Sequence, residues 1–185
     1  MKNAKSLYHG HRFPAAVISC AVRWYFRFQL SLRDIEELLF ERGVIVSYET
    51  IRRWCDKFGA GFAHRVKAAR RKPGKIVTDQ LRSYPAAKAE IPELAHVKHV
   101  FVKASARLNN RAENSHQPTR ERERRMRGFR DPERTQAFLS SFGPIRQHFA
   151  LKRHLLRASL YRKQLAVRFD VWHRFTELTQ NPSAF

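Results

Sequence analysis

Two acidic residues stand where carboxylates can hold a metal ion. Asp79 directly follows the short apolar run 75–78, and Glu113 lies inside the polar stretch 108–117. A carboxylate at the end of a buried strand is fixed by the sheet and still reaches water and substrate. Two such groups can bind Mg²⁺ (or Mn²⁺), so that one ion activates an attacking oxygen and another stabilises the leaving one. The sequence therefore predicts a metal site for phosphoryl chemistry at Asp79 and Glu113.

Asp79 taken alone has a simpler explanation, because Asp is common in turns and at helix N-termini. Glu113 changes that balance, since it shares one face of an expected helix with Arg120, two turns further on. The carboxylate can face the sheet, and the arginine can hold a phosphate. Pro118 removes one backbone hydrogen bond from this helix, so a kink or a local break is expected there.

The elements that would position these groups form a strand, a helix and a second strand. Apolar runs at 75–78 and 97–102 are typical of short strands, and a short helix is expected between them from Ser83. This order predicts a parallel crossover unit.

The composition points to a nucleic-acid partner. The 185 residues include 37 Lys and Arg against 16 Asp and Glu, a formal charge of +21 with a pI near 11.1. Such an excess strengthens binding to phosphates, although basic ribosomal and membrane-surface proteins share it. The 43% hydrophobic share and 14 Phe argue for a folded core rather than a disordered tail.

Other site classes are disfavoured. No stretch approaches the ~20 apolar residues of a membrane span, so we expect a cytoplasmic protein. Cys20 and Cys55 lie in apolar helical patterns and are expected to be reduced, buried thiols. The histidines show no spacing typical of a zinc site.

The N-terminal third predicts a helix-turn-helix domain over 11–60. Helical periodicity begins at Pro14, a second helix starts at Ser31, Gly43 closes it, and a third opens at Ser47. The third helix fits a major groove. Its predicted DNA-binding residues are Tyr48, Arg52, Arg53 and Lys57. A purely structural three-helix bundle with solvated arginines is the alternative, and the charge of +21 favours DNA binding.

A basic linker is expected over 61–74, and a densely charged run follows later at 120–130. The run suits contact with a DNA backbone, with Arg122, Arg124 and Arg125 as predicted contacts. The alternative is a charged helix face that only contacts solvent. Asp131 and Pro132 then predict a helix start, Gly143 and Pro144 a bend, and Trp172 with the C-terminal phenylalanines a core role.

The blocks 12–15, 47–54, 77–79 and 109–117 resemble bacterial insertion-sequence transposases of the IS-six family. The resemblance implies a helix-turn-helix and an RNase-H-like core with an Asp-Asp-Glu triad. It implies that Asp79 corresponds to the second Asp, Glu113 to the Glu and Arg120 to the following basic residue. It also implies Mg²⁺ or Mn²⁺ as cofactor, and terminal inverted repeats and target DNA as partners.

The chain departs from this pattern between the helix-turn-helix and the strand at 75–78. The segment that carries the first catalytic Asp is absent, as if an internal deletion joined 70 to 73. Asp34 and Asp56 are the earlier aspartates, and both lie on predicted helices of the DNA-binding domain. The expected fold is therefore mostly α with a small β remnant: the helix-turn-helix bundle, then a truncated RNase-H-like core with C-terminal helices over 75–178.

Three functions remain open from the sequence. The first is a transposase, nucleoid-associated and catalytically defective because its triad is incomplete. The second is a DNA-binding regulator that inhibits a full-length transposase through mixed oligomers, whereas the first could form a homo-oligomer. The third is a decayed gene product without a selected activity.

Overall fold

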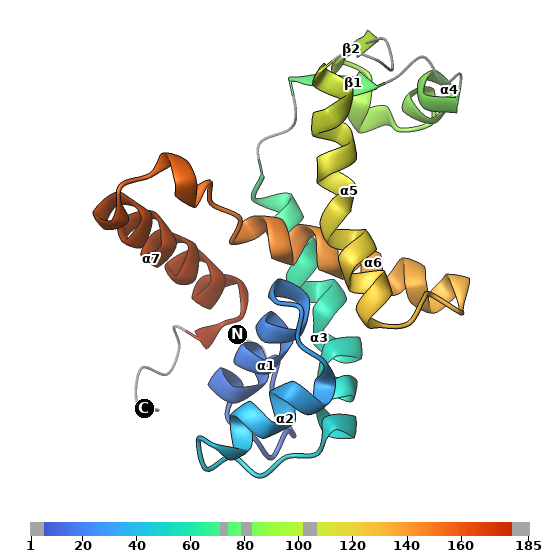
Figure 1. Ribbon diagram of the computed structural model, residues 1–185. Helices are drawn as coiled ribbons and strands as arrows, with labels where there is room; N and C mark the ends of the chain where they lie inside the picture. The colour runs from blue at the N-terminus through green and yellow to red at the C-terminus, as the bar shows by residue number, and fades with distance from the viewer. Residues whose placement is uncertain (1–5, 71–73, 79–82, 102–106, 179–185) are drawn as a thin grey trace, which may run out of the picture. The chain divides into compact units, whose positions relative to one another are not determined.

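The computed structural model describes residues 6–70, 74–78, 83–101 and 107–178. The chain divides into two compact units (Figure 1). Unit 1 combines residues 1–69 with 130–185, and unit 2 comprises residues 70–129. Helices dominate the described chain, and a single two-stranded sheet accompanies them there. This confirms the predicted mostly helical class with a small β remnant.

Unit 1 begins with helices α1 (Ala15–Arg27), α2 (Leu32–Phe40) and α3 (Tyr48–Ala68). The capping box of α2 is present, because Ser31 N donates to Asp34 Oδ2 at 2.8 Å and Asp34 N donates to Ser31 Oγ at 3.1 Å. Ser47 caps α3 by accepting from the backbone N–H of Thr50. These starts agree with the sequence because each depends on residues only three positions apart.

The connection between α2 and α3 turns at Gly43, whose φ is +75°. A left-handed backbone favours glycine, which carries no Cβ. The N–H of Val44 donates to the carbonyl of Leu39 at 2.9 Å, which satisfies an otherwise open carbonyl at the end of α2. The predicted helix-closing role of Gly43 is confirmed.

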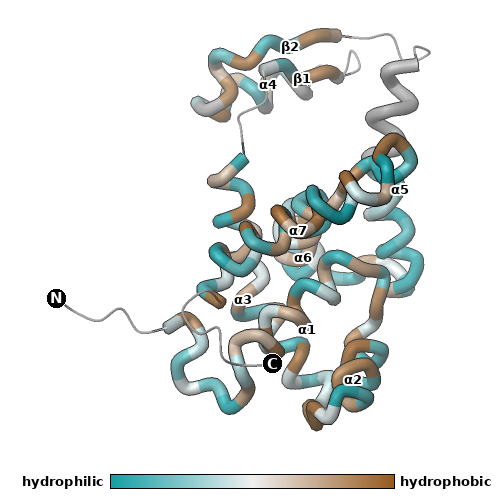
Figure 2. Tube along the Cα trace, turned by 90° about the vertical axis from the view of Figure 1, so that its left-hand side faces the viewer, coloured by the Kyte–Doolittle hydropathy of each residue, from teal (hydrophilic) through white to brown (hydrophobic). Residues whose placement is uncertain are grey.

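The apolar faces of α1, α2 and α3 pack together, and the hydropathy along each helix can be followed in Figure 2. Gly59 marks the closest approach of α3 to α1. A Cβ built on it would lie 2.8 Å from Cε2 of Phe26, so only glycine fits there without movement of the ring. The buried core of these helices includes Ile18, Val22, Phe26, Ile35, Leu39, Ile51, Trp54, Cys55 and Phe58.

Helix α3 continues well past the predicted helix-turn-helix. Phe62, Ala63 and Val66 are buried, with exposed fractions of 1–2%, so the first part of the predicted linker 61–74 belongs to the helix and to the core. The apolar spacing from Phe58 through Phe62 to Val66 is helical, and burial outweighs the low helix propensity of the two glycines in this stretch.

Unit 1 is completed by α6 (Pro132–His148), a 3₁₀ turn η2 (Arg153–Leu155) and α7 (Ala158–Phe175). Helix α6 packs on α3 and α1, and α7 packs on α3. Asp131 caps α6 as predicted, by accepting from the N–H groups of Glu133 and Arg134. The helix continues through Pro144, so the bend expected there does not interrupt it.

This arrangement differs from the predicted division, which grouped the C-terminal helices with the core over 75–178. Aromatic packing explains the difference. The ring centroids of Phe62 and Trp172 lie 5.5 Å apart, and those of Phe26 and Phe138 lie 5.8 Å apart. Aromatic side chains bury large areas, and the apolar surface available to α6 and α7 is that of α1 and α3.

Three hydrogen bonds join distant parts of unit 1. Trp172 Nε1 donates to Ser19 Oγ at 3.0 Å, and Tyr8 Oη donates to the carbonyl of Thr176 at 2.8 Å. Burial raises the pKa of Tyr8 above its ordinary value. The guanidinium of Arg27 donates to the carbonyl of Phe149 at 3.1 Å, at the end of α6. The indole N–H of Trp172 and the hydroxyl of Tyr8, both buried, therefore have partners.

The core role expected of Trp172 and the C-terminal phenylalanines is confirmed at Trp172 and Phe149, while aliphatic side chains nearby are exposed. Trp172 and Phe149 are buried, whereas Leu155 and Val167 are exposed by 68% and 54%. Both cysteines are free of disulfides; Cys55 is buried and Cys20 is half-buried. Of the helices in the described part of the chain, none has the length and apolarity needed to cross a membrane.

Unit 2 contains β1 (Lys75–Thr78), α4 (Ser83–Ala89), a 3₁₀ turn η1 (Pro92–Leu94), β2 (Lys98–Phe101) and α5 (Arg107–Arg125). The strands pair in parallel, with Lys75 opposite Lys98 and Thr78 opposite Phe101. This confirms the predicted strand, helix, strand order of a crossover unit. Helix α5 runs through Pro118, so the local break expected at this proline does not occur.

Candidate nucleic-acid interface

The exposed side of α3 presents two different surfaces. Ile51, Trp54 and Phe58 turn into the core and leave the remaining side of the helix to solvent. At 3.6 residues per turn, the exposed residues fall along two adjacent edges. One edge, here called the paired edge, is Glu49, Arg52 and Asp56. The other, here called the basic edge, is Arg53 and Lys57.

Arg52 is held by two acidic neighbours. Its Nε donates to Glu49 Oε2 at 3.0 Å, and its Nη1 donates to Asp56 Oδ2 at 3.1 Å. The hydrogen bond from Arg52 lowers the pKa of Glu49, and the same bond raises the pKa of Arg52. One positive and two negative groups leave the paired edge with a net charge of −1. Arg52, predicted to contact DNA, is thus engaged along its own helix.

The cations of the basic edge form no salt bridge within the part of the chain that the structure describes. Arg53 is exposed and forms no hydrogen bond or ion pair with a side chain in the ranges that the structure describes. Lys57 Nζ lies 2.8 Å from Nε2 of His11. A lysine ammonium can only donate, so this ring nitrogen accepts and is unprotonated. Burial and, after it, the charge of Lys57 lower the pKa of His11.

Tyr48, the first residue of α3, is 41% exposed. The guanidinium carbon of Arg33, on α2, lies 5.3 Å from the centroid of its ring. A cation stacked on an aromatic face connects the start of α3 to α2 and leaves the guanidinium at the surface. Arg33 therefore lies at the surface beside Tyr48, although it was not among the predicted DNA-binding residues.

The predicted arginines of α5 divide by helical position. Arg120, Arg124 and Arg125 are exposed, whereas Arg122 is only 2% exposed. Residues two positions apart point about 200° apart on a helix, so Arg122 lies on the opposite side from Arg120. Arg122 was predicted to contact DNA at the surface, but its side chain is buried. Figure 2 shows the end of α5 as strongly hydrophilic.

Neither predicted carboxylate lies among the side chains that the structure describes. Asp79 lies outside the described residues, and so does the side chain of Glu113, whose backbone belongs to α5. Next to the Asp79 position, Thr78 Oγ1 and His99 Nε2 lie 2.7 Å apart and join β1 to β2. Within the described ranges, no three His, Cys, Asp or Glu side chains gather as a metal site.

The two earlier aspartates already have structural roles. Asp34 completes the capping box at the start of α2. Asp56 accepts from Arg52 on α3. Both lie in unit 1, whereas Asp79 and Glu113 belong to unit 2. Recruiting either aspartate as a third ligand would remove it from a contact that its own helix uses.

Known proteins resemble parts of this chain. A family model described as a DDE domain matches residues 42–153. The Staphylococcus aureus transposase for insertion sequence-like element IS431mec is 47% identical over 47 residues, 25% of this chain and 21% of that protein. The transposase for insertion sequence element IS257 in transposon Tn4003, also from Staphylococcus aureus, is 45% identical over 47 residues with the same coverage. No solved structure matches.

The aligned part thus spans about a fifth of the length of these curated relatives. The family match is far longer, and it runs from the end of α2, through α3 and the whole of unit 2, into the C-terminal helices. Because it covers more than half of the 185 residues, the chain belongs to the DDE-domain family of insertion-sequence transposases, of the IS-six type.

Proposed function

We propose that this chain is an insertion-sequence transposase that binds DNA through a helix-turn-helix made by α2 and α3 and has lost strand transfer. The observation that carries the DNA-binding part is the basic edge of α3, where Arg53 and Lys57 are exposed on a helix whose opposite side is fixed in a core. A rigid helix with an exposed basic side fits the major groove, which is about 12 Å wide.

The residues of this interface divide by role. Arg53 and Lys57 contact phosphates or base edges directly, and Tyr48 with Arg33 lies at the start of the same helix. Arg52 can contact DNA only after its bonds to Glu49 and Asp56 are broken. Its net contribution to the binding free energy is therefore smaller. The proposed partners are the terminal inverted repeats of the element and the target DNA. The connection 41–47 is longer than the turn of about 3–4 residues that usually joins the two helices of this motif.

Unit 2 supplies a second basic surface. Arg120, Arg124 and Arg125 are exposed near the end of α5, and the polar stretch before them carries Glu113. Phosphate contacts of this kind position a duplex without reading its sequence. We assign Arg120 to the phosphate beside Glu113 and the other two to the flanking backbone.

The carboxylates left from the family's catalytic set are proposed to be Asp79 and Glu113, which would hold Mg²⁺ or Mn²⁺. Two carboxylates do not fit a metal pair that needs three, and Asp34 and Asp56 are engaged in unit 1. No reaction step follows from an incomplete ligand set. The loss of the first Asp, by an internal deletion after residue 70, is therefore the proposed cause of the catalytic defect.

Nicking of a supercoiled plasmid that carries the two ends of the element tests this assignment. The assay compares wild type with Asp79→Ala and Glu113→Ala, first in Mg²⁺ and then in Mn²⁺. We expect end-specific binding without nicking. End-specific nicking by wild type, abolished by both substitutions, would overturn the defect, because another group would then complete the site.

A regulator of a complete transposase is the second candidate. It is favoured by unit 1, where a packed aromatic core supports an exposed basic edge although the catalytic set is incomplete. Such a chain would occupy the terminal repeats or form mixed oligomers. Inhibition of a full-length relative in trans, lost in Arg53→Ala with Lys57→Ala, is the expected result; absence of inhibition would reject it. A decayed product would instead show a non-cooperative thermal transition.

A further inference from the structure

The segment 7–13, here called the arm, lies against α3 before the first helix begins. Three ring pairs hold it there, each with centroids 5.2 Å apart: Tyr8 with Phe58, His11 with Phe58, and Phe13 with Trp54. Tyr8 is only 7% exposed and donates to the carbonyl of Thr176. The arm is therefore part of the unit 1 core and not a loose end.

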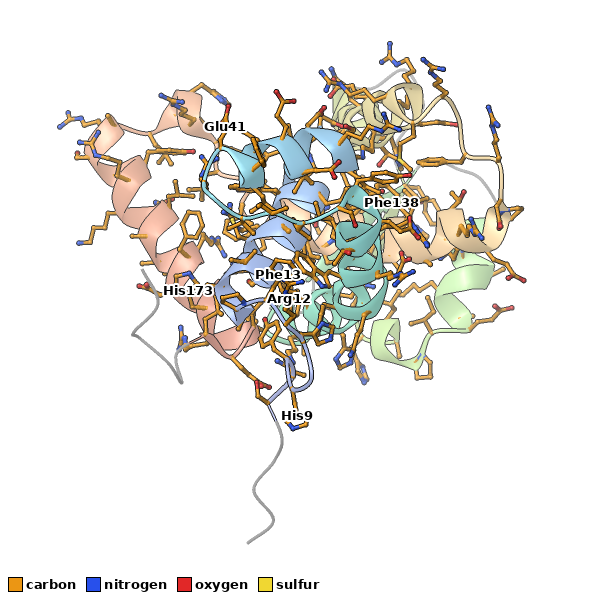
Figure 3. The ribbon with its side chains drawn as sticks, turned by 90° about the horizontal axis from the view of Figure 1, so that it is seen from below. His9, Arg12, Phe13, Glu41, Phe138 and His173 are labelled. Atoms are coloured by element: carbon orange, nitrogen blue, oxygen red, sulfur yellow. The ribbon has the colours of Figure 1, made fainter. Side chains whose placement is uncertain are left out.

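The backbone of the arm turns between its anchors. Gly10 has a φ of +80°, a region that favours glycine, and the N–H of His11 donates to the carbonyl of Tyr8 at 3.0 Å. This turn sends alternate side chains in different directions. Tyr8 points into the core, while His9 and Arg12 are exposed. In Figure 3, His9 projects from the edge of the molecule and Arg12 lies beside Phe13.

The arm reaches the basic edge of α3 and not the paired edge. His11 meets Lys57 at 2.8 Å, and Phe13 packs on Trp54, the residue that follows Arg53. The guanidinium carbon of Arg12 lies 5.8 Å from the centroid of the ring of its neighbour Phe13. The side chain of Arg12 therefore packs over a ring that is itself held against Trp54. The arm and the basic edge thus meet where His11 contacts Lys57.

We infer that the arm is a second DNA-contacting element, in which Arg12 binds phosphates that flank the groove occupied by α3. This inference rests on the proposed DNA binding by α3 and adds a residue that the helix-turn-helix pattern does not contain. A guanidinium forms two parallel hydrogen bonds with a phosphate. Because the arm is already ordered on α3, binding would not have to order it first.

Arg12→Ala is the test substitution, and Arg162→Ala is its matched control. Arg162 is exposed on α7 and lies 14 positions before the Thr176 that the arm contacts, roughly 20 Å along the helix axis. Both changes remove one positive charge. Affinity would be measured by fluorescence anisotropy on two duplexes of equal length, one from the element's end and one with scrambled sequence, over a range of salt.

We expect Arg12→Ala to weaken binding to both duplexes by about tenfold and to lower the slope of log affinity against log salt by about 0.9. Arg162→Ala should change neither quantity, and Arg12→Lys should keep the slope. Circular dichroism melts confirm that the variants are folded. Equal effects of Arg12→Ala and Arg162→Ala would overturn the inference, because the arm would then act only through the total charge.

Arg53→Ala in the same series separates this inference from the function on which it rests. Weakened binding by Arg53→Ala with none by Arg12→Ala rejects the arm and leaves DNA binding by α3 in place. No effect from either substitution rejects both. Weakening by Arg12→Ala on both duplexes, together with loss of preference for the end sequence by Arg53→Ala, is the full expected result.

Discussion

Lys57 Nζ and His11 Nε2 lie 2.8 Å apart, so a lysine on the proposed DNA-contacting side of α3 donates to a neutral histidine from the segment before α1. This contact joins two parts of the chain that the sequence pattern treats separately. It also sets the protonation state of His11, because a protonated ring could neither accept this hydrogen bond nor avoid the lysine charge.

The first prediction concerns the pH dependence of stability. Burial and Lys57 lower the pKa of His11 below 6.5, its ordinary value and its expected value in the unfolded chain. The unfolded chain then binds more protons, so the free energy of unfolding is full above about pH 6.5 and falls as the pH drops through the folded pKa. Urea unfolding at several pH values should show a shallower fall for His11→Gln than for wild type. Parallel profiles for the two proteins would contradict this.

The second prediction uses two glycines on one helix. A Cβ at Gly59 would meet the Phe26 ring at 2.8 Å, whereas one at Gly61 would meet nothing within 4 Å. Gly59→Ala should therefore destabilise unit 1 by about 1–3 kcal/mol through overpacking. Gly61→Ala should instead stabilise the helix by about 0.5–1 kcal/mol. Thermal and urea unfolding of both variants check this, and a similar shift in both would rule out the close approach of α1 to α3.

The third prediction concerns the buried hydrogen bond from Trp172 Nε1 to Ser19 Oγ, 3.0 Å long. Both residues are 1% exposed. Ser19→Ala leaves a buried indole N–H without this acceptor and should cost about 1–3 kcal/mol. Ser159→Ala, on the exposed side of α7, is the control and should change the unfolding free energy by less than about 0.5 kcal/mol. A negligible cost at Ser19 would show that the bond adds nothing to docking of α7.

The fourth prediction concerns the paired edge of α3. Glu49→Gln removes the carboxylate that accepts from Arg52 at 3.0 Å and changes the local charge from −1 to neutral. Affinity for duplex DNA should rise, by about two- to fivefold at low salt, since the arginine becomes available to phosphates. The exposed Glu133→Gln, at the start of α6, controls for the change in total charge. Equal gains from the two substitutions would assign the effect to total charge alone.

Local signals made the helix starts predictable. Ser31 with Asp34, Ser47 and Asp131 each cap a helix with partners within three residues, and Gly43 adopts the left-handed turn expected of it. The parallel pairing of the two short strands was likewise predictable from the order of apolar runs. Such features depend on neighbours in the sequence, which is why the pattern suffices.

Long-range packing was not predictable in the same way. Whether Trp172 and Phe138 cover a sheet or the helices α1 and α3 depends on which apolar surface is available, and periodicity is the same in both cases. Prolines 118 and 144 suggested interruptions, yet α5 and α6 continue through them. In α6, Pro144 is buried in the unit 1 packing, which supports the helix despite one missing backbone bond.

Some contacts of the candidate site were predictable from the sequence and others were not. The pairing of Arg52 was readable from the sequence, because acids stand three residues before it and four after it on the same helix. The burial of Arg122 was not predictable, because the residues around it in the sequence are charged on every side of the helix. The arm was not readable, since its role depends on contacts with Phe58 and Trp54 across the fold. The assignments of Asp79 and Glu113 stay predictions.

The hydrogen bonds from Tyr8 to Thr176 and from Trp172 to Ser19 have a consequence for how the protein is made. They join segments that lie before and after unit 2 in the sequence. Unit 2 is therefore an insertion within unit 1, and α7 is translated later than α1 and α3. On the ribosome, α1 and α3 emerge with their aromatic surface still uncovered, which favours chaperone binding or aggregation. The packing of the arm and α3, on which the proposed DNA binding depends, would be complete only after α7 has been released.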